Sequence, residues 1–332
     1  IASPGLTLSA GDSDTFLEIM DTMARDLKGP LFPNIGSGDY TNMTSMDAPL
    51  WFFWSLQQYI IYTGDKKTIQ ERYLGKLRGI LEGYKSGTEF NIHMMDSGLI
   101  WGGQEGVALT WMDAITSDGP VTPRIGCPVE IQALWYNALC FYHELTGDEE
   151  YAALASKVKD SFDREFWSWD YGYLADVVDG EEKDWSIRPN MIFATSLPYT
   201  ILSEEKCDKV LEIVKSKLLT PRGLRSLSPD DPGYKGYYFG NQTSRDHAYH
   251  NGTVWAWLLG HFVEGYLKLH GKAAKNFVEK IIKGFDGVMT QYGIGTVAEI
   301  YDGDAPHRPK GSVSQAWSIA ELLRMMDLVK RI

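Results

Sequence analysis

The sequence predicts an all-α protein in which an inner ring of helices is surrounded by an outer ring. Two observations predict this arrangement: helical segments of two kinds alternate along the 332 residues, and the connections between them alternate in length. Strand-turn-strand patterns at regular spacing are missing from the sequence, which argues against a β-sandwich or a propeller. Short β-ribbons inside the long connections remain compatible with the pattern, for example around 171–174.

Each element follows from its hydrophobic pattern. Five segments carry apolar residues on one face only, at the spacing of an amphipathic helix. These segments are 16–27, 66–85, 151–162, 207–218 and 277–288. Six others are apolar nearly all round, namely 1–10, 48–62, 129–145, 189–201, 252–269 and 312–328. Because a helix that is apolar on every side must be buried on every side, we assign these six to the inner ring and the other five to the outer ring.

The connections indicate where function lies. Each inner helix passes to the next outer helix through two or three residues, whereas each return is long. The long returns are 29–46, 86–128, 167–188, 219–251 and 290–311. All of them therefore lie at one end of the ring, where we expect the functional site. The chain reads as one domain, 1–332. A complete ring needs a sixth outer helix, which we expect in an N-terminal part of the same protein, upstream of Ile1.

Composition excludes several partners. The formal net charge is −12, which argues against nucleic acid and anionic membranes as partners. No apolar window approaches the ~18 residues of a transmembrane helix. The three cysteines form no CxxC pair, so we expect a reducing compartment, the cytoplasm.

The long connections combine carboxylates, indoles and amides without any cofactor motif, so we expect no cofactor. His247 and His250 lie near Asp246, but a third ligand is not evident and we expect no metal. This mixture suits sugars, whose apolar faces stack on aromatic rings while carboxylates and amides bind the hydroxyls. Paired carboxylates in an aromatic pocket also acquire different pKa values, as an acid and a base require.

Seven stretches together resemble the amylo-α-1,6-glucosidase domain of glycogen debranching enzymes of the archaeal and bacterial type. They are 110–114, 121–130, 134–139, 186–190, 223–229, 249–257 and 299–303. The resemblance implies an (α/α)6 toroid, here without its first outer helix, and inverting hydrolysis of α-1,6-linked glucose in an α-glucan such as glycogen or limit dextrin. It places the general acid on Asp113 and the general base on Glu299. Inversion requires their carboxyl groups to stand ~6.5–9.5 Å apart.

Further residues are expected to bind the substrate: Asp47, Trp51, Trp111, Arg124, Glu130, Trp135, Arg188, Asn190, Tyr249, His250 and Trp255. Simpler interpretations stay open for several of them. The tryptophans on inner helices also suit a core, Asp113 also suits a loop brace, and Glu299 also suits an ion pair with Arg124 or Arg308. The chain departs from the family pattern at Cys127, where lysine is commoner. It also lacks a substrate-contacting Trp-Gly-Arg-Asp-Thr segment just ahead of residues 3–6.

Two other classes of function remain open. One is another (α/α)6 enzyme, either a glucan or trehalose hydrolase or a sugar epimerase that uses histidine. The other is a non-catalytic glucan-binding domain, which the missing segment makes plausible.

Overall fold

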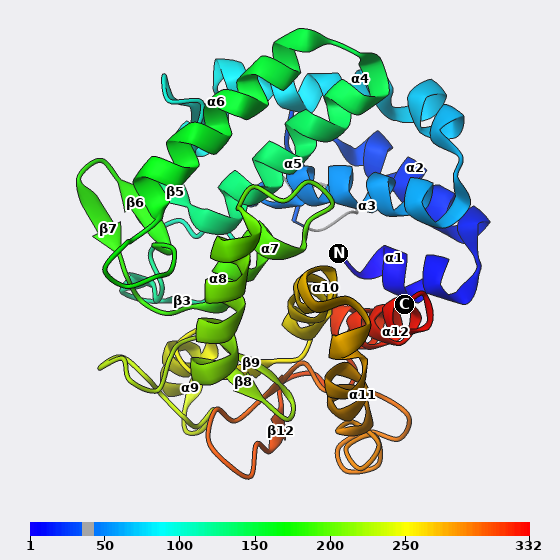
Figure 1. Cartoon of the computed structure of the whole chain (residues 1–332). Helices are drawn as coiled ribbons and strands as arrows, with labels where there is room; N and C mark the ends of the chain where they lie inside the picture. The colour runs from blue at the N-terminus through cyan, green and yellow to red at the C-terminus, as the bar shows by residue number, and fades with distance from the viewer. Residues whose placement is uncertain (35–42) are drawn as a thin grey trace.

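The computed structural model describes residues 1–34 and 43–332, and helices dominate it (Figure 1). The predicted inner segments contain α1 (Ala2–Leu6), α3 (Ala48–Thr63), α5 (Val129–Thr146), α7 (Phe193–Ser196), α10 (Leu258–His270) and α12 (Ala316–Lys330). The predicted outer segments contain α2 (Ser13–Asp26), α4 (Lys66–Ser86), α6 (Glu149–Phe166), α8 (Glu204–Lys217) and α11 (Lys275–Lys283). Helices α3, α5 and α10 are buried along most of their length, whereas α1 and α12 are only partly buried.

Contacts between the inner helices close into a cycle. In order, α3 contacts α5, α5 contacts α7, α7 contacts α10, α10 contacts α12, α12 contacts α1, and α1 contacts α3. The outer helices α2, α4 and α8 each contact the inner helix before them and the one after them. Figure 1 shows α1 beside α12, with the N-terminus near the middle of the view.

Short turns join inner to outer helices, as the sequence predicts. Helices α3 and α5 end at Gly64 (φ 74°) and Gly147 (φ 71°), in the left-handed conformation that glycine adopts without strain. The next residues, Asp65 and Asp148, accept a backbone N–H in the first turn of α4 and α6. These caps stop one helix and start the next within two residues.

Two inner helices are shorter than predicted. The helical segment expected over 189–201 is a 3-10 turn (Pro189–Ile192) followed by α7, which ends at Ser196. The ring of Pro198 disfavours helical geometry at Leu197, which is extended. Helix α10 begins at Leu258 because Val254 and Trp255 form a strand instead.

The long connections contain short β-ribbons, which the sequence left possible, although residues 171–174 form only an isolated bridge at Leu174. They carry helix α9 (Gln242–Tyr249) and strands of two or three residues. An antiparallel sheet has the order β12-β11-β10-β9-β8, with bounds Pro309–Lys310, Ile300–Tyr301, Val254–Trp255, Gly223–Arg225 and Leu219–Thr220. A second sheet joins β5 (Cys127–Pro128), β6 (Val177–Asp179) and β7 (Glu182–Asp184). Two hairpins, β1–β2 (His93–Met94, Ile100–Trp101) and β3–β4 (Ile115–Thr116, Gly119–Pro120), lie between α4 and α5. The first sheet ties together connections far apart in sequence.

The flank formed by α1 and α12 leaves apolar side chains exposed, as α3 does at Ile61. Leu6, Leu323 and Met326 are exposed there. Throughout the two described ranges, every helix is too short or too polar to cross a bilayer.

Candidate active site

A cavity of about 560 Å³ opens where the first turns of α3 and α12 meet the long connections. Its walls include these residues predicted for the site: Asp47, Trp51, Trp111, Asp113, Tyr249, Trp255 and Glu299. Asp47 and Trp51 lie at the start of α3, and Trp111 and Asp113 lie in the connection between α4 and α5. Tyr249 ends α9, Trp255 is in β10, and Glu299 directly precedes β11. The structure therefore brings both predicted catalytic carboxylates to one cavity.

Asp113 lies in the open part of this cavity, with 67% of its side chain exposed. Its Oδ1 is 3.5 Å from Nε2 of His250, which is fully buried. Burial lowers the pKa of His250 below its ordinary value, although Asp113 acts in the opposite direction. The ring of His250 packs against those of Trp111 and Trp255, with centroids 5.2 and 5.1 Å away, and the two indoles also meet each other at 5.3 Å. Asp113 thus faces an imidazole that is neutral at neutral pH.

Glu299 is held by three donors. The phenol of Tyr249 donates to Oε1 at 2.5 Å, the amide of Gln315 donates to Oε1 at 3.4 Å, and the backbone N–H of Ser312 donates to Oε2 at 2.8 Å. Burial and the bond to Glu299 raise the pKa of Tyr249, so the phenol remains a donor. Neither ion pair considered for Glu299, with Arg124 or with Arg308, is present in the described part of the chain, and Arg124 binds other carboxylates in the interior.

Asp47 is a third carboxyl group in the cavity. It is the N-cap residue of α3 and is buried, and Ser45 donates to its Oδ1 at 2.5 Å. Burial raises the pKa of Asp47, and the charge of Asp113 adds to this effect. Asp47 is therefore a buried carboxyl group in the same cavity as the mostly exposed Asp113.

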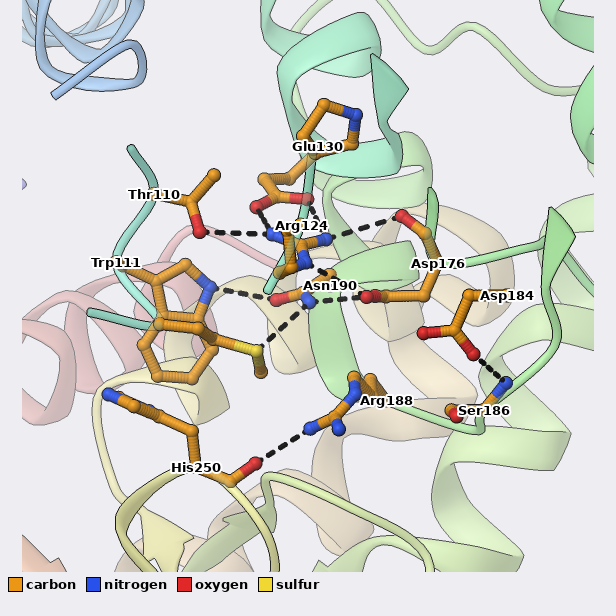
Figure 2. A network of polar contacts seen from close by, with 12 residues as sticks. Thr110, Trp111, Arg124, Glu130, Asp176, Asp184, Ser186, Arg188, Asn190 and His250 are labelled. Atoms are coloured by element: carbon orange, nitrogen blue, oxygen red, sulfur yellow. Dashed lines mark hydrogen bonds and ion pairs between the residues drawn. The ribbon is translucent and has the colours of Figure 1, made fainter. Parts of the chain in front are cut away.

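A buried network lies behind Trp111 (Figure 2). The indole N–H of Trp111 donates to Oδ1 of Asn190 at 2.7 Å, and Asn190 donates to Asp176 at 2.8 Å. Arg124 donates to Asp176 at 2.9 Å and to Glu130 at 2.7 Å. Arg124, Glu130 and Asn190 thus support the cavity wall and do not line the cavity. Asp176 was not predicted from the sequence. The one local feature that could have indicated it is the presence of a carboxylate within the otherwise apolar run 174–178.

Three other predicted residues, Arg188, Trp135 and His250, do not line the cavity, and His250 is fully buried. Arg188 donates to the carbonyl of His250 at 2.6 Å and to the side chain of Asn251 at 3.0 Å, so it holds the backbone of that connection (Figure 2). Trp135 donates to the carbonyl of Gly98 at 3.1 Å in the core. Its ring stacks on Tyr84, and it has no route to a ligand in the cavity.

Trp317 lines the cavity but was not among the predicted residues. Its ring stacks on Trp257, with centroids 4.9 Å apart, and meets Trp255 edge-on at 5.7 Å. It stands in the first turn of α12, as Trp51 stands in the first turn of α3. Trp51 was predicted because it lies near the N-terminus of an inner helix, and the same reasoning applies to Trp317.

In the described part of the chain, no three potential metal ligands come together.

Fold and cavity together define a mainly helical protein with an aromatic, carboxylate-bearing cavity at the ends of its inner helices. The family model described as amylo-alpha-1,6-glucosidase matches residues 1–324. The chain belongs to this family, which confirms the family that the sequence resembles but not the archaeal and bacterial type.

The chain is similar to a glycogen debranching enzyme from Saccharomyces cerevisiae, with 24% identity over 370 residues. That alignment covers 82% of this chain and 24% of the yeast protein, so the chain spans about a quarter of the relative's length.

Proposed function

We propose that this chain is an inverting glycosidase that releases glucose from α-1,6 branch points of glycogen or limit dextrin. The observation that carries the proposal is the placement of Asp113 and Glu299 on one aromatic cavity. Family membership supports the substrate class. The cycle of inner-helix contacts supports the (α/α)6 toroid that the family resemblance implies.

The two carboxyl groups have different roles in this proposal. Asp113, in its protonated form, gives its proton to the glycosidic oxygen as the bond to the anomeric carbon breaks. The Glu299 carboxylate takes a proton from a water whose oxygen attacks the opposite face of the same carbon. Afterwards Asp113 is ionised and Glu299 is protonated, and proton exchange with solvent restores both. The hydrogen bonds from Tyr249 and Ser312 orient Glu299 toward that water.

The aromatic walls and Asp47 supply binding in this proposal. Trp51, Trp111, Trp255 and Trp317 offer ring surface to the apolar faces of glucose. Asp47 offers a carboxyl group to its hydroxyls. We place the reaction in the cytoplasm, because all three cysteines are free thiols, as expected in a reducing compartment.

The test is glucose release from branched limit dextrin, compared with maltose and trehalose. The proposal predicts release from the dextrin, and a loss of about 10²–10⁴-fold in turnover for Asp113→Asn and for Glu299→Gln. Asp118→Asn is the matched control, because it is an exposed aspartate in the same connection, on the turn between β3 and β4. Preference for maltose or trehalose would favour another toroid hydrolase, and binding without turnover would favour a glucan-binding domain.

A further inference from the structure

A second hollow of about 520 Å³ lies beside the cavity, and we call it the flanking groove. Its walls are Tyr238, Phe239, Gly240, Arg245, Tyr292, Lys310 and Gly311. These residues come from α9 and the segment before it, the connection after α11, and the end of β12.

The flanking groove and the cavity share a thin wall. The ring of Tyr238 lies 5.7 Å from that of Tyr249, which bonds Glu299. On the other side, Gly311 touches Glu299 so closely that a Cβ there would lie 3.1 Å from the Glu299 carboxyl carbon. Tyr249, Glu299 and Gly311 therefore separate the two hollows, and a ligand that extends beyond the cavity past this wall enters the groove.

The groove offers the chemistry that an oligosaccharide needs. Phe239 is 78% exposed and presents an uncovered ring, and Tyr292 is exposed beside it. Arg245 and Lys310 supply N–H donors for hydroxyl groups. An exposed apolar surface with a polar rim is typical of a ligand groove.

The groove is also tied structurally to the proposed base. Tyr292 donates to the carbonyl of Gly311 at 3.0 Å, and the next residue, Ser312, donates to Glu299. The backbone N–H of Tyr238 donates at 2.9 Å to Asp302, on the hairpin that follows Glu299. The groove walls are therefore positioned by the elements that position Glu299.

We propose that the flanking groove binds α-1,4-linked glucosyl units of the main chain on which the branch stands. This inference rests on the proposed function. At a branch point the main chain extends in two directions from the acceptor unit, so it does not fit inside the cavity with the branch glucose. In this inference it crosses the rim on the side of the flanking groove, where Phe239 and Tyr292 would stack on its pyranose rings and Arg245 and Lys310 would bind its hydroxyls.

The test compares two substrates that differ in the main chain. Branched limit dextrin has one, whereas α-glucosyl fluoride is a single glucosyl unit. Phe239→Ala is expected to lower kcat/KM for the dextrin about tenfold more than for the fluoride, as loss of one stacked ring worth about 1.4 kcal/mol would do. Trp169→Ala is the matched control, because Trp169 is 77% exposed on the connection after α6 and is expected to leave this ratio unchanged.

A binding measurement separates the outcomes. Calorimetry of maltopentaose with Glu299→Gln should give a Kd that Phe239→Ala weakens about tenfold, equivalent to about 1.4 kcal/mol. An unchanged substrate ratio together with an unchanged Kd would overturn the inference. If Lys310→Met instead abolishes binding of inorganic phosphate while maltopentaose binding is unaffected by Phe239→Ala, the groove is an anion site. A wild-type chain that is inactive on both substrates would contradict the proposed function. In that case the calorimetry alone would show whether the flanking groove binds α-1,4-linked glucosyl units.

Discussion

The phenol of Tyr249 donates a 2.5 Å hydrogen bond to Oε1 of Glu299. The two residues come from the end of α9 and the residue before β11, and the sheet that pairs β10 with β11 brings them together. Because burial and this bond raise the pKa of Tyr249, the phenol keeps its proton and orients the carboxylate. In the proposed mechanism it thus acts as a positioning residue for the base.

Tyr249→Phe removes only this hydroxyl. We expect kcat on limit dextrin to fall about 10- to 100-fold, because hydrogen bonds to charged groups contribute about 1.5–3 kcal/mol. Tyr199→Phe is the control, since the phenol of Tyr199 makes a similar 2.7 Å bond to Glu144 outside the cavity. Steady-state kinetics of both variants checks this, and an unchanged kcat for Tyr249→Phe would remove it from the mechanism.

The helical framework was predictable because its signals are local. Apolar periodicity and capping residues such as Asp65 and Asp148 act within a few positions of the chain. The strand at Trp255 was not predictable in this way, since it forms only by pairing with Leu224 and Ile300, far away in sequence.

The candidate site was also predictable where its signals are local in sequence. Conspicuous motifs marked Asp113 and Glu299, but motifs do not say which neighbours face the cavity. Arg124 binds Asp176, 52 positions away, and so belongs to a buried support that local sequence does not reveal. Trp135 carries the same aromatic signal as Trp51 but lies further along its helix, in the core.

Arg124→Met is expected to lower the free energy of unfolding by about 3–5 kcal/mol, because it leaves Glu130 and Asp176 buried without their cation. Arg164→Met is the control, since Arg164 is 63% exposed, pairs with the neighbouring Glu165 and donates to Ser161 at 3.4 Å. That change should cost no more than about 1 kcal/mol. Urea unfolding measures both, and similar losses would contradict the role given to the buried network.

His261 should make stability depend on pH. It is fully buried, and burial with the nearby cations Arg324 and Lys268 lowers its pKa well below the ordinary value. The unfolded chain, with a pKa of about 6.5 at this residue, then binds more protons than the folded chain, so stability falls as the pH drops below that value.

From pH 7.5 to 5.5 this residue should cost about 1.4 kcal/mol of stability. His261→Asn, which keeps a polar group near Ser196, should reduce the pH dependence by that amount. Urea unfolding of both proteins at the two pH values gives the difference, in which the effects of other buried groups cancel. Parallel pH profiles would show that His261 titrates normally in the folded protein.

The anomeric configuration of the first glucose released from limit dextrin tests the two-carboxylate site most directly. Attack by water on the face opposite the leaving group converts an α-linkage into β-glucose, whereas a covalent intermediate retains the α-configuration. Proton NMR in the first minutes, before mutarotation, distinguishes the two anomers. We predict that β-glucose appears first and that Asp113→Asn and Glu299→Gln both abolish its signal. Initial release of α-glucose would contradict the assignment of Asp113 as acid and Glu299 as base.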